Sequence, residues 1–285
     1  MQDWQHSVIY QIYPKSFYSQ AGNPTGDLLG VVAKLDYLQW LGVDYLWLTP
    51  FLRSPQRDNG YDISDYYAID PSYGTMADCE LLIAEAGKRG IKLMLDIVVN
   101  HTSIEHVWFQ QARSSLDSPY RDFYIWRDQP NNWESKFGGS AWEYEAQTGQ
   151  YYLHLFDHTQ ADLNWDNPKV RQEVFKMMRF WRDKGVGGFR LDVINLISKP
   201  ADFPEDASDG RRFYTDGPNV HEYLQEMHRE VFEGHDLINV GEMSSTSLEH
   251  CIRYSRPDSK ELSMTFNFHH LKVCLLYTSD AADDS

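Results

Sequence analysis

A charged pair at the end of a short apolar run has the residue types needed for nucleophilic chemistry. In an extended 188–192 segment, Phe189 and Leu191 face one side, while Arg190 and Asp192 face the other. A nearby arginine favours the ionised carboxylate and lowers its pKa. An ionised carboxylate can attack carbon. The pair can equally be a structural ion pair, and this stretch alone leaves both interpretations open.

Two more carboxylates lie in apolar runs. Asp96 is within 93–99, and Glu242 ends 237–242. If the runs are neighbouring parallel strands, Asp192 and Glu242 can converge on one bond. Two carboxyl groups about 5–5.5 Å apart form the retaining glycosidase arrangement. Because Arg190 adjoins only Asp192 in sequence, we predict Asp192 as nucleophile and Glu242 as acid/base, with the Glu242 pKa raised by the charge of Asp192.

Apolar runs alternate with helical patterns along the chain. Nearly all-apolar strands are typical of a parallel sheet that is buried on both faces. The predicted fold class is α/β, an incomplete (β/α)8 TIM barrel with about six of eight units. The predicted strands are 8–13, 45–48, 93–99, 188–192, 237–242 and 264–268, and the predicted helices are 31–41, 77–89, 166–184, 220–232 and 247–254.

One long segment interrupts this alternation after the third predicted strand. Residues 103–164 are rich in Trp, Tyr, Gly, Asn and Asp, and they are too many for an ordinary loop. We therefore predict an inserted subdomain at 103–164. It divides the barrel into a first segment at 1–102 and a second, incomplete segment at 165–273. Residues 274–285 fit neither barrel segment.

The composition of the chain excludes several classes of binding partner. The net charge of −16 argues against nucleic acid and anionic membranes, which need clustered Lys and Arg. Three cysteines without metal-like spacing indicate a reducing compartment rather than a disulfide framework. No signal-peptide pattern and no apolar run of ~20 residues is present. We expect a cytoplasmic protein; the oligomeric state is not predicted.

Four motifs resemble, in order, those of the α-amylase superfamily (glycoside hydrolase family 13). The resemblance covers Trp4 to Val273 and implies an α-retaining glycosidase with Asp192 as nucleophile and Glu242 as acid/base. It also implies that Arg190 holds the nucleophile's charge. The motifs are Asp96–His101, Gln160–Trp165, Gly188–Asp192 and Val240–Glu242.

The same resemblance assigns sugar-binding residues. His101 and Asp62 are expected to hydrogen-bond the sugar on the cleaved side, although His101 alone would be read as a structural histidine. Tyr61 and Asp62 match the family's pocket-closing position, which suits removal of a single terminal glucose.

Three stretches (135–142, 241–251 and 266–272) resemble the family members that hydrolyse trehalose 6-phosphate to glucose and glucose 6-phosphate. Oligo-1,6-glucosidases share the catalytic motifs and are the alternative. A small-molecule disaccharide that carries a phosphate needs a cation near the leaving sugar. Lys272 is the predicted cation and Arg212 a second candidate; a solvated surface lysine is the alternative for Lys272.

Two stretches of the sequence depart from the family's pattern. Residues 19–27 offer fewer oxygen ligands than the calcium loop of many relatives, so no metal and no cofactor are expected. Residues 274–285 resemble a translated sequencing adapter, and the family's third catalytic aspartate is not encoded, so we expect the chain as written to be inactive. Non-catalytic transporter subunits share the fold, but they lack the full set of catalytic carboxylates and carry a membrane helix.

Overall fold

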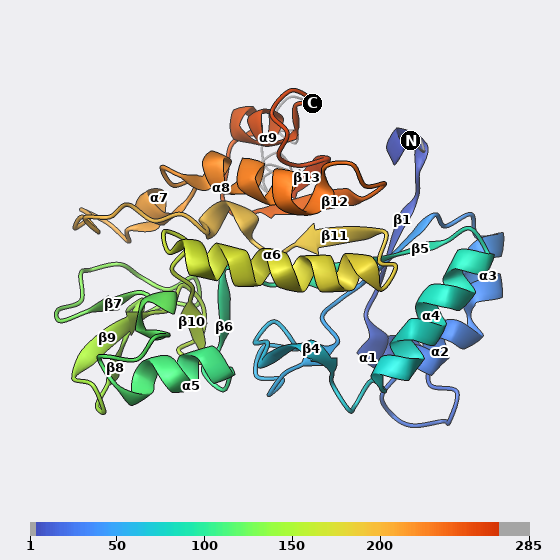
Figure 1. Ribbon diagram of the computed structural model, residues 1–285, viewed down its shortest axis with the longest axis horizontal. Helices are drawn as coiled ribbons and strands as arrows, with labels where there is room; N and C mark the ends of the chain where they lie inside the picture. Colours follow the sequence, from blue (N-terminus) through green and yellow to red (C-terminus); the bar gives the residue numbers. More distant parts are fainter. Residues whose placement is uncertain (1–3, 268–285) are drawn as a thin grey trace, which may run out of the picture.

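Six parallel strands form the central sheet of this computed structural model, which describes residues 4–267 (Figure 1). Every neighbouring pair is parallel, and the order across the sheet is the order along the chain. The predicted incomplete (β/α)8 barrel is therefore confirmed for the described residues. The strands are β1 (Ile9–Ile12), β2 (Tyr45–Leu48), β5 (Lys92–Ile97), β11 (Gly188–Leu191), β12 (Ile238–Met243) and β13 (Met264–Asn267).

Helices connect these strands close to the predicted positions. The exception is the predicted helix 31–41, which is two helices divided at Lys34. There the backbone amide donates to the carbonyl oxygen of Val31, only three residues back, and this ends the α-helical pattern. The helices between the strands are α2 (Leu28–Ala33), α3 (Leu35–Trp40), α4 (Met76–Lys88), α6 (Pro168–Asp183), α8 (Val220–Met227, extended by a π-helical turn at His228–Phe232) and α9 (Leu248–Ser255).

Local sequence explains where the longer helices begin. Thr75 and Asp78 form a reciprocal capping box at the start of α4. At α6, the side chain of Asn167 accepts from the amide of Lys169, and Pro168 occupies the first turn.

The segment between β5 and α6 builds a small body beside one end of the sheet (Figure 1). It holds helix α5 and an antiparallel sheet in the order β7-β9-β8, and β6 pairs antiparallel with β10 at its base. Helix α5 was not predicted from the sequence; the boundaries 103–164 stay a prediction. The remaining elements are α1 (Pro14–Phe17), β3 (Leu52–Arg53), β4 (Asp65–Ile69), β6 (His101–Ser103), α5 (Val107–Ser114), β7 (Trp126–Arg127), β8 (Trp142–Glu145), β9 (Gln150–Leu153), β10 (Gln160–Asp162) and α7 (Arg211–Tyr214).

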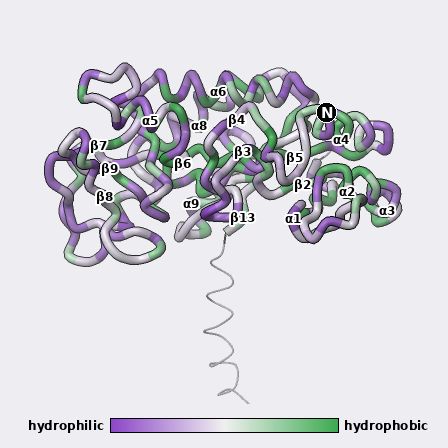
Figure 2. Tube along the Cα trace, turned by 90° about the horizontal axis from the view of Figure 1, so that it is seen from below, coloured by the Kyte–Doolittle hydropathy of each residue, from purple (hydrophilic) through white to green (hydrophobic). Residues whose placement is uncertain are grey.

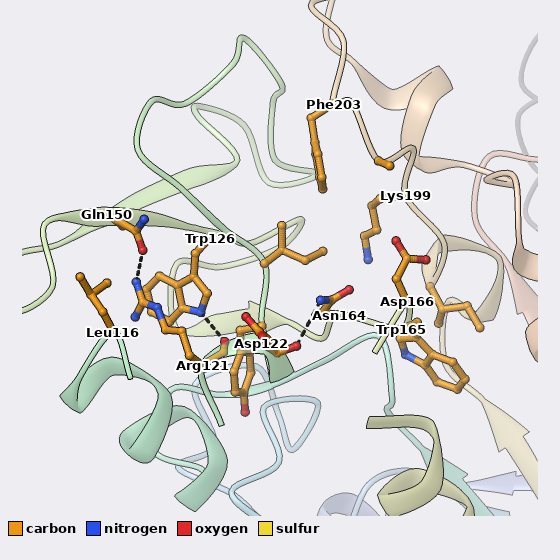
Figure 3. Close-up of a pocket in the computed structure, with 14 residues that line it drawn as sticks. Leu116, Arg121, Asp122, Trp126, Gln150, Asn164, Trp165, Asp166, Lys199 and Phe203 are labelled. Carbon is orange, nitrogen blue, oxygen red and sulfur yellow. Dashed lines mark hydrogen bonds between the residues drawn. The ribbon is translucent and has the colours of Figure 1, made fainter. Parts of the chain in front are cut away.

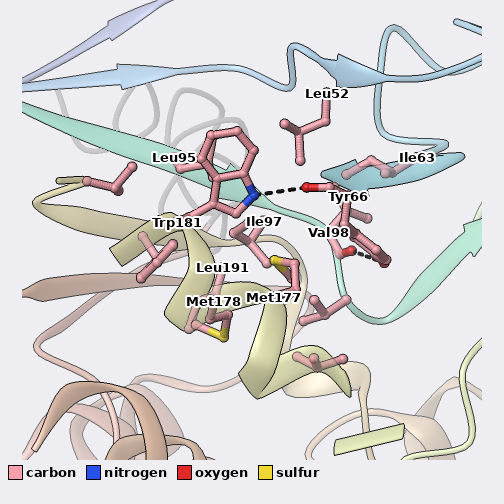
Figure 4. Packing of buried hydrophobic residues seen from close by; sticks show 14 of the residues in the cluster. Leu52, Ile63, Tyr66, Leu95, Ile97, Val98, Met177, Met178, Trp181 and Leu191 are labelled. Carbon is pink, nitrogen blue, oxygen red and sulfur yellow. Dashed lines mark hydrogen bonds between the residues drawn. The ribbon is translucent and has the colours of Figure 1, made fainter. Parts of the chain in front are cut away.

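Helix α6 closes one face of the sheet through large apolar side chains (Figure 4). The fully buried indole of Trp181 donates from Nε1 to the carbonyl oxygen of Tyr66 at 2.9 Å, and the Tyr66 hydroxyl donates to the carbonyl of Val98 at 2.8 Å. Leu95 and Leu191 complete this contact region from β5 and β11. Figure 2 shows hydrophobic segments in the middle of the molecule and hydrophilic ones along outer loops.

We expect Trp181→Ala to lower the free energy of unfolding by about 3–5 kcal/mol, because it opens a cavity and leaves the Tyr66 carbonyl unpaired. Urea unfolding followed by circular dichroism measures this. Trp40→Ala is the matched control: Trp40 is 80% exposed, so its loss should change stability by no more than about 0.5 kcal/mol. Equal effects of the two changes would contradict the packing described for α6.

Candidate active site

The register of the parallel strands brings the candidate catalytic residues together. Arg190 lies opposite Asp96 on β5 and opposite Val240 on β12, two residues before Glu242. Asp192 follows directly after β11. Strand alternation turns these polar side chains toward the same interior, while Phe189 and Leu191 face the hydrophobic core. The three predicted carboxylates therefore meet at the carboxyl ends of three adjacent strands.

Arg190 is the centre of this group. Its Nη1 donates to Asp96 Oδ1 at 2.7 Å and to Asp192 Oδ1 at 2.6 Å, and its Nη2 donates to Glu242 Oε2. The guanidinium also lies over the rings of Trp47 and Tyr61. All three carboxylates and the arginine are buried, so one positive charge is shared by three acidic groups.

The environment raises the pKa of the predicted nucleophile. Burial raises the pKa of Asp192 to about 7; Arg190 opposes this rise, while the nearby charge of Glu242 adds to it. Burial likewise raises the pKa of Asp96 to about 6. Arg190 thus lowers the Asp192 pKa as expected, but the net shift is upward, because desolvation outweighs a cation that is divided among three carboxylates.

A cavity of about 490 Å³ opens onto these carboxylates, and we call it the catalytic cavity. Five of the predicted site residues line it: Tyr61, His101, Arg190, Asp192 and Glu242. Sequence reasoning missed most of the rest of its lining, because no spacing pattern marks these positions. The missed lining residues are Gln11, Tyr13, Trp47, Asp58, Phe137, Phe156, Val193 and Phe266.

His101 is held by its neighbours in one orientation. Its Nε2 lies 3.1 Å from the carbonyl oxygen of Tyr61, an acceptor, so this nitrogen carries the proton. Its Nδ1 accepts from the side-chain amide of Asn100 at 3.2 Å. Burial lowers the pKa of His101, so the imidazole is neutral near pH 7. A sugar contact by His101 stays a prediction.

Asp62 does not line the catalytic cavity. Its carboxylate accepts from the Ser54 hydroxyl at 2.8 Å and from the backbone amides of Arg57 and Asp58 at 3.0 and 3.1 Å. These bonds fold the loop so that Asp58 reaches the cavity instead, where Asp58 Oδ2 accepts from Gln160 Nε2 at 2.9 Å. In this structure Asp62 shapes the cavity wall through these bonds, and its predicted sugar contact stays a prediction.

Comparison with known proteins agrees with this arrangement. The family model described as "Alpha amylase, catalytic domain" matches residues 11–282. The chain belongs to the alpha-amylase family. No described helix is long and apolar enough to cross a membrane.

Relatives of this alpha-amylase family chain include two kinds of α-glucosidase. Trehalose-6-phosphate hydrolase of Bacillus subtilis (strain 168) is 64% identical over 277 residues, which cover 95% of this chain and 49% of that protein. Oligo-1,6-glucosidase of Parageobacillus thermoglucosidasius is 55% identical over 282 residues, which cover 95% of this chain and 50% of that protein. The chain spans about half the length of the curated relatives it matches.

A solved structure matches the fold closely. The crystal structure of Bacillus licheniformis trehalose-6-phosphate hydrolase superposes with a TM-score of 0.93 at 62% identity, covering 94% of this chain and 50% of that chain. The six-stranded sheet is thus that of an alpha-amylase catalytic domain.

A buried lysine joins the inserted segment to the barrel in this family member. Lys199 Nζ lies 2.7 Å from Asp162 Oδ2 at the end of β10 and donates to Asn100 Oδ1 at 3.0 Å. Asp162 also accepts from the backbone amide of Leu155 and the side-chain amide of Asn100. Sequence reasoning missed Lys199, because only the fold brings it to residues about 40 and 100 positions away.

Of the two predicted phosphate-binding cations, only Arg212 is described, and it does not line the catalytic cavity. Lys272 lies outside the described residues. Arg212 pairs with Asp206 at 2.9 Å and packs over the ring of Phe213. In the predicted metal-free loop, Asp27 accepts from the amide of Gly30 and caps α2; the absence of a metal stays a prediction.

A second cavity of about 490 Å³ lies between the inserted segment and the loop after β11 (Figure 3). Its main polar groups are already paired: Arg121 donates to Gln150, and the Trp126 indole donates to the Arg121 carbonyl oxygen. Lys199, at its wall, is bound to Asp162. It holds no carboxylate pair comparable to Asp192 and Glu242 among its described lining residues, so we assign the chemistry to the catalytic cavity.

If Asp192 is the predicted nucleophile, it must be ionised to attack, and its raised pKa predicts an acidic limb of the pH–rate profile near pH 7 rather than near pH 4. We expect kcat/KM of the full-length protein to fall about tenfold per pH unit below that point. The measurement uses 4-nitrophenyl α-glucoside, which has no ionisable phosphate. An acidic limb below pH 5 would contradict the raised pKa that burial gives Asp192.

We expect Lys199→Met to destabilise the protein by about 3–5 kcal/mol, since it leaves the buried Asp162 without its cation. The double variant Lys199→Met/Asp162→Asn removes both charges and should recover some of this loss. Urea unfolding of the two single variants and the double variant completes the cycle. Strictly additive effects would show that the pair is not coupled.

Proposed function

We propose that the full-length protein is a retaining, exo-acting α-glucosidase that hydrolyses trehalose 6-phosphate to glucose and glucose 6-phosphate. The observation that carries the proposal is that Asp192 and Glu242 line one cavity and accept hydrogen bonds from the same guanidinium, that of Arg190. The trehalose-6-phosphate hydrolases among its relatives, at 62–64% identity, support the substrate.

The first half of the reaction forms a covalent intermediate. Asp192 attacks the anomeric carbon of the terminal glucose, while protonated Glu242 gives its proton to the glycosidic oxygen. The C–O bond breaks, glucose 6-phosphate leaves, and the glucosyl group stays on the Asp192 carboxylate as an ester. The Arg190 guanidinium stabilises the Asp192 carboxylate before attack. It also stabilises the negative charge that Glu242 carries after it has given up its proton.

The second half returns the enzyme to its starting state. Ionised Glu242 takes a proton from water, and the water oxygen attacks the same carbon. Glucose leaves with its original anomeric configuration, and Asp192 is again a carboxylate. Aromatic walls formed by Trp47, Tyr61 and Phe156 favour a sugar ring in the cavity. The proposed chemistry needs no metal and no cofactor.

Oligo-1,6-glucosidase activity is the alternative, since relatives of that name are 50–55% identical to the chain. A non-catalytic transporter subunit fits less well, because both carboxylates and their arginine lie together in an open cavity.

The proposal is tested with the full-length protein against trehalose 6-phosphate and isomaltose. We expect a higher kcat/KM for trehalose 6-phosphate. A preference for isomaltose would favour the oligo-1,6-glucosidase alternative.

Two variants separate the catalytic roles in the same assays. Asp192→Asn should lower kcat about 10⁴-fold or more on every substrate, because the nucleophile is lost. Glu242→Gln should lower kcat/KM, which reports the first half of the reaction, far less on 4-nitrophenyl α-glucoside, whose leaving group needs no proton, than on trehalose 6-phosphate. The reverse pattern would exchange the two assignments.

A further inference from the structure

A hairpin of the inserted segment, residues 134–140, contributes Phe137 to the wall of the catalytic cavity. Glu134 and Ser140 form an antiparallel bridge, and the amide of Ser135 donates to the carbonyl oxygen of Gly139 at 2.9 Å. Gly138 and Gly139 both have positive φ, which lets the chain reverse this tightly. The bridge and this hydrogen bond close the hairpin at its base.

Two consecutive side chains project from this hairpin. Phe137 lines the catalytic cavity and packs edge-on against Phe156 at 5.6 Å. The backbone amide of Lys136 donates to the carbonyl oxygen of Leu155 at 2.7 Å. Its side chain crosses to the barrel, where Nζ lies 3.5 Å from the hydroxyl of Ser245 and 5.3 Å from the ring of Tyr214.

Ser245 belongs to the barrel and is held in place by its neighbours in the chain. It follows Glu242 by three residues, and its φ of 55° turns the chain sharply after β12. Ser244, before it, exchanges two hydrogen bonds with the side chain of Asn195, and Thr246, after it, donates to Asp216 at 2.6 Å. Lys136 and Ser245 therefore meet at a fixed place beside the acid/base residue.

The proposed reaction indicates which part of the substrate lies near Lys136 and Ser245. Glu242 protonates the glycosidic oxygen, which departs with the leaving sugar, so the leaving sugar occupies the side of the cavity next to Glu242. A chain of net charge −16 needs a local cation to hold an anionic substrate. The ammonium of Lys136 lies beside Ser245, just after the end of β12, the strand that carries Glu242, and the next residue of the hairpin, Phe137, lines the cavity.

We propose that Lys136, together with the Ser245 hydroxyl, binds the phosphate of the leaving sugar. An ammonium and a hydroxyl offer the charge-assisted and neutral donors that phosphate oxygens accept. The inference rests on the proposed function, because it needs a substrate whose leaving group is a sugar phosphate. It makes Lys136 a specificity residue that acts on the substrate and leaves the bond-breaking groups unchanged.

The test compares two substrates in the full-length protein. Lys136→Met should raise the KM for trehalose 6-phosphate about 10- to 100-fold relative to the KM for 4-nitrophenyl α-glucoside, since a charged hydrogen bond is lost. Ser245→Ala should shift the same ratio about two- to tenfold. Lys136→Arg, which keeps the charge, should restore some of the loss.

Two further variants serve as controls. Lys88→Met removes a lysine on α4 that pairs with Glu85, and Arg212→Met removes the other cation considered from sequence. Neither should change the ratio of the two KM values. Glucose 6-phosphate should inhibit the wild type more strongly than glucose does, and Lys136→Met should remove that difference.

The two possible failures are distinguishable. If the wild type does not prefer trehalose 6-phosphate, the proposed function fails. If it does, but Lys136→Met leaves the KM ratio and the product inhibition unchanged, the phosphate site lies elsewhere; a shifted ratio in Arg212→Met alone would place it at Arg212.

Discussion

One buried guanidinium shared by three carboxylates is the constraint on which the rest of this molecule depends. Arg190 can reach Asp96, Asp192 and Glu242 together only because β5, β11 and β12 are adjacent, parallel and in a fixed register. Isolated buried charges cost several kcal/mol each, so the group persists only where a packed sheet holds it. The apolar core between the sheet and α6 therefore stabilises an arrangement that is unfavourable by itself.

The same excess of negative charge explains the reactivity of the site. Three carboxylates around one cation keep a proton available near neutral pH, and burial raises the pKa of Asp192. Glycoside cleavage needs one carboxyl group charged and the other protonated at the same pH. The raised pKa of Asp192 means that this carboxyl is partly protonated near pH 7 and must be ionised before it can act as the proposed nucleophile.

Sequence predicted the elements whose signal is local. The six strands were found because each is a short apolar run, and Asp192 and Glu242 because they end two of them. The division of the helix at Lys34, the burial that reverses the Asp192 pKa shift, and the Lys199 contact with Asp162 were not found. These depend on what the folded chain places nearby, which no spacing records.

Under the proposed function, the inserted segment provides a way for an anionic substrate to bind near an acidic site. A phosphate close to the three carboxylates would be repelled, so its cation must lie apart from Arg190, toward the solvent. The hairpin supplies that separation: Phe137 faces the cavity, while Lys136 is directed to Ser245. Because Lys199 fixes the base of the same segment to the barrel, the distance between the phosphate cation and the nucleophile is set by the fold.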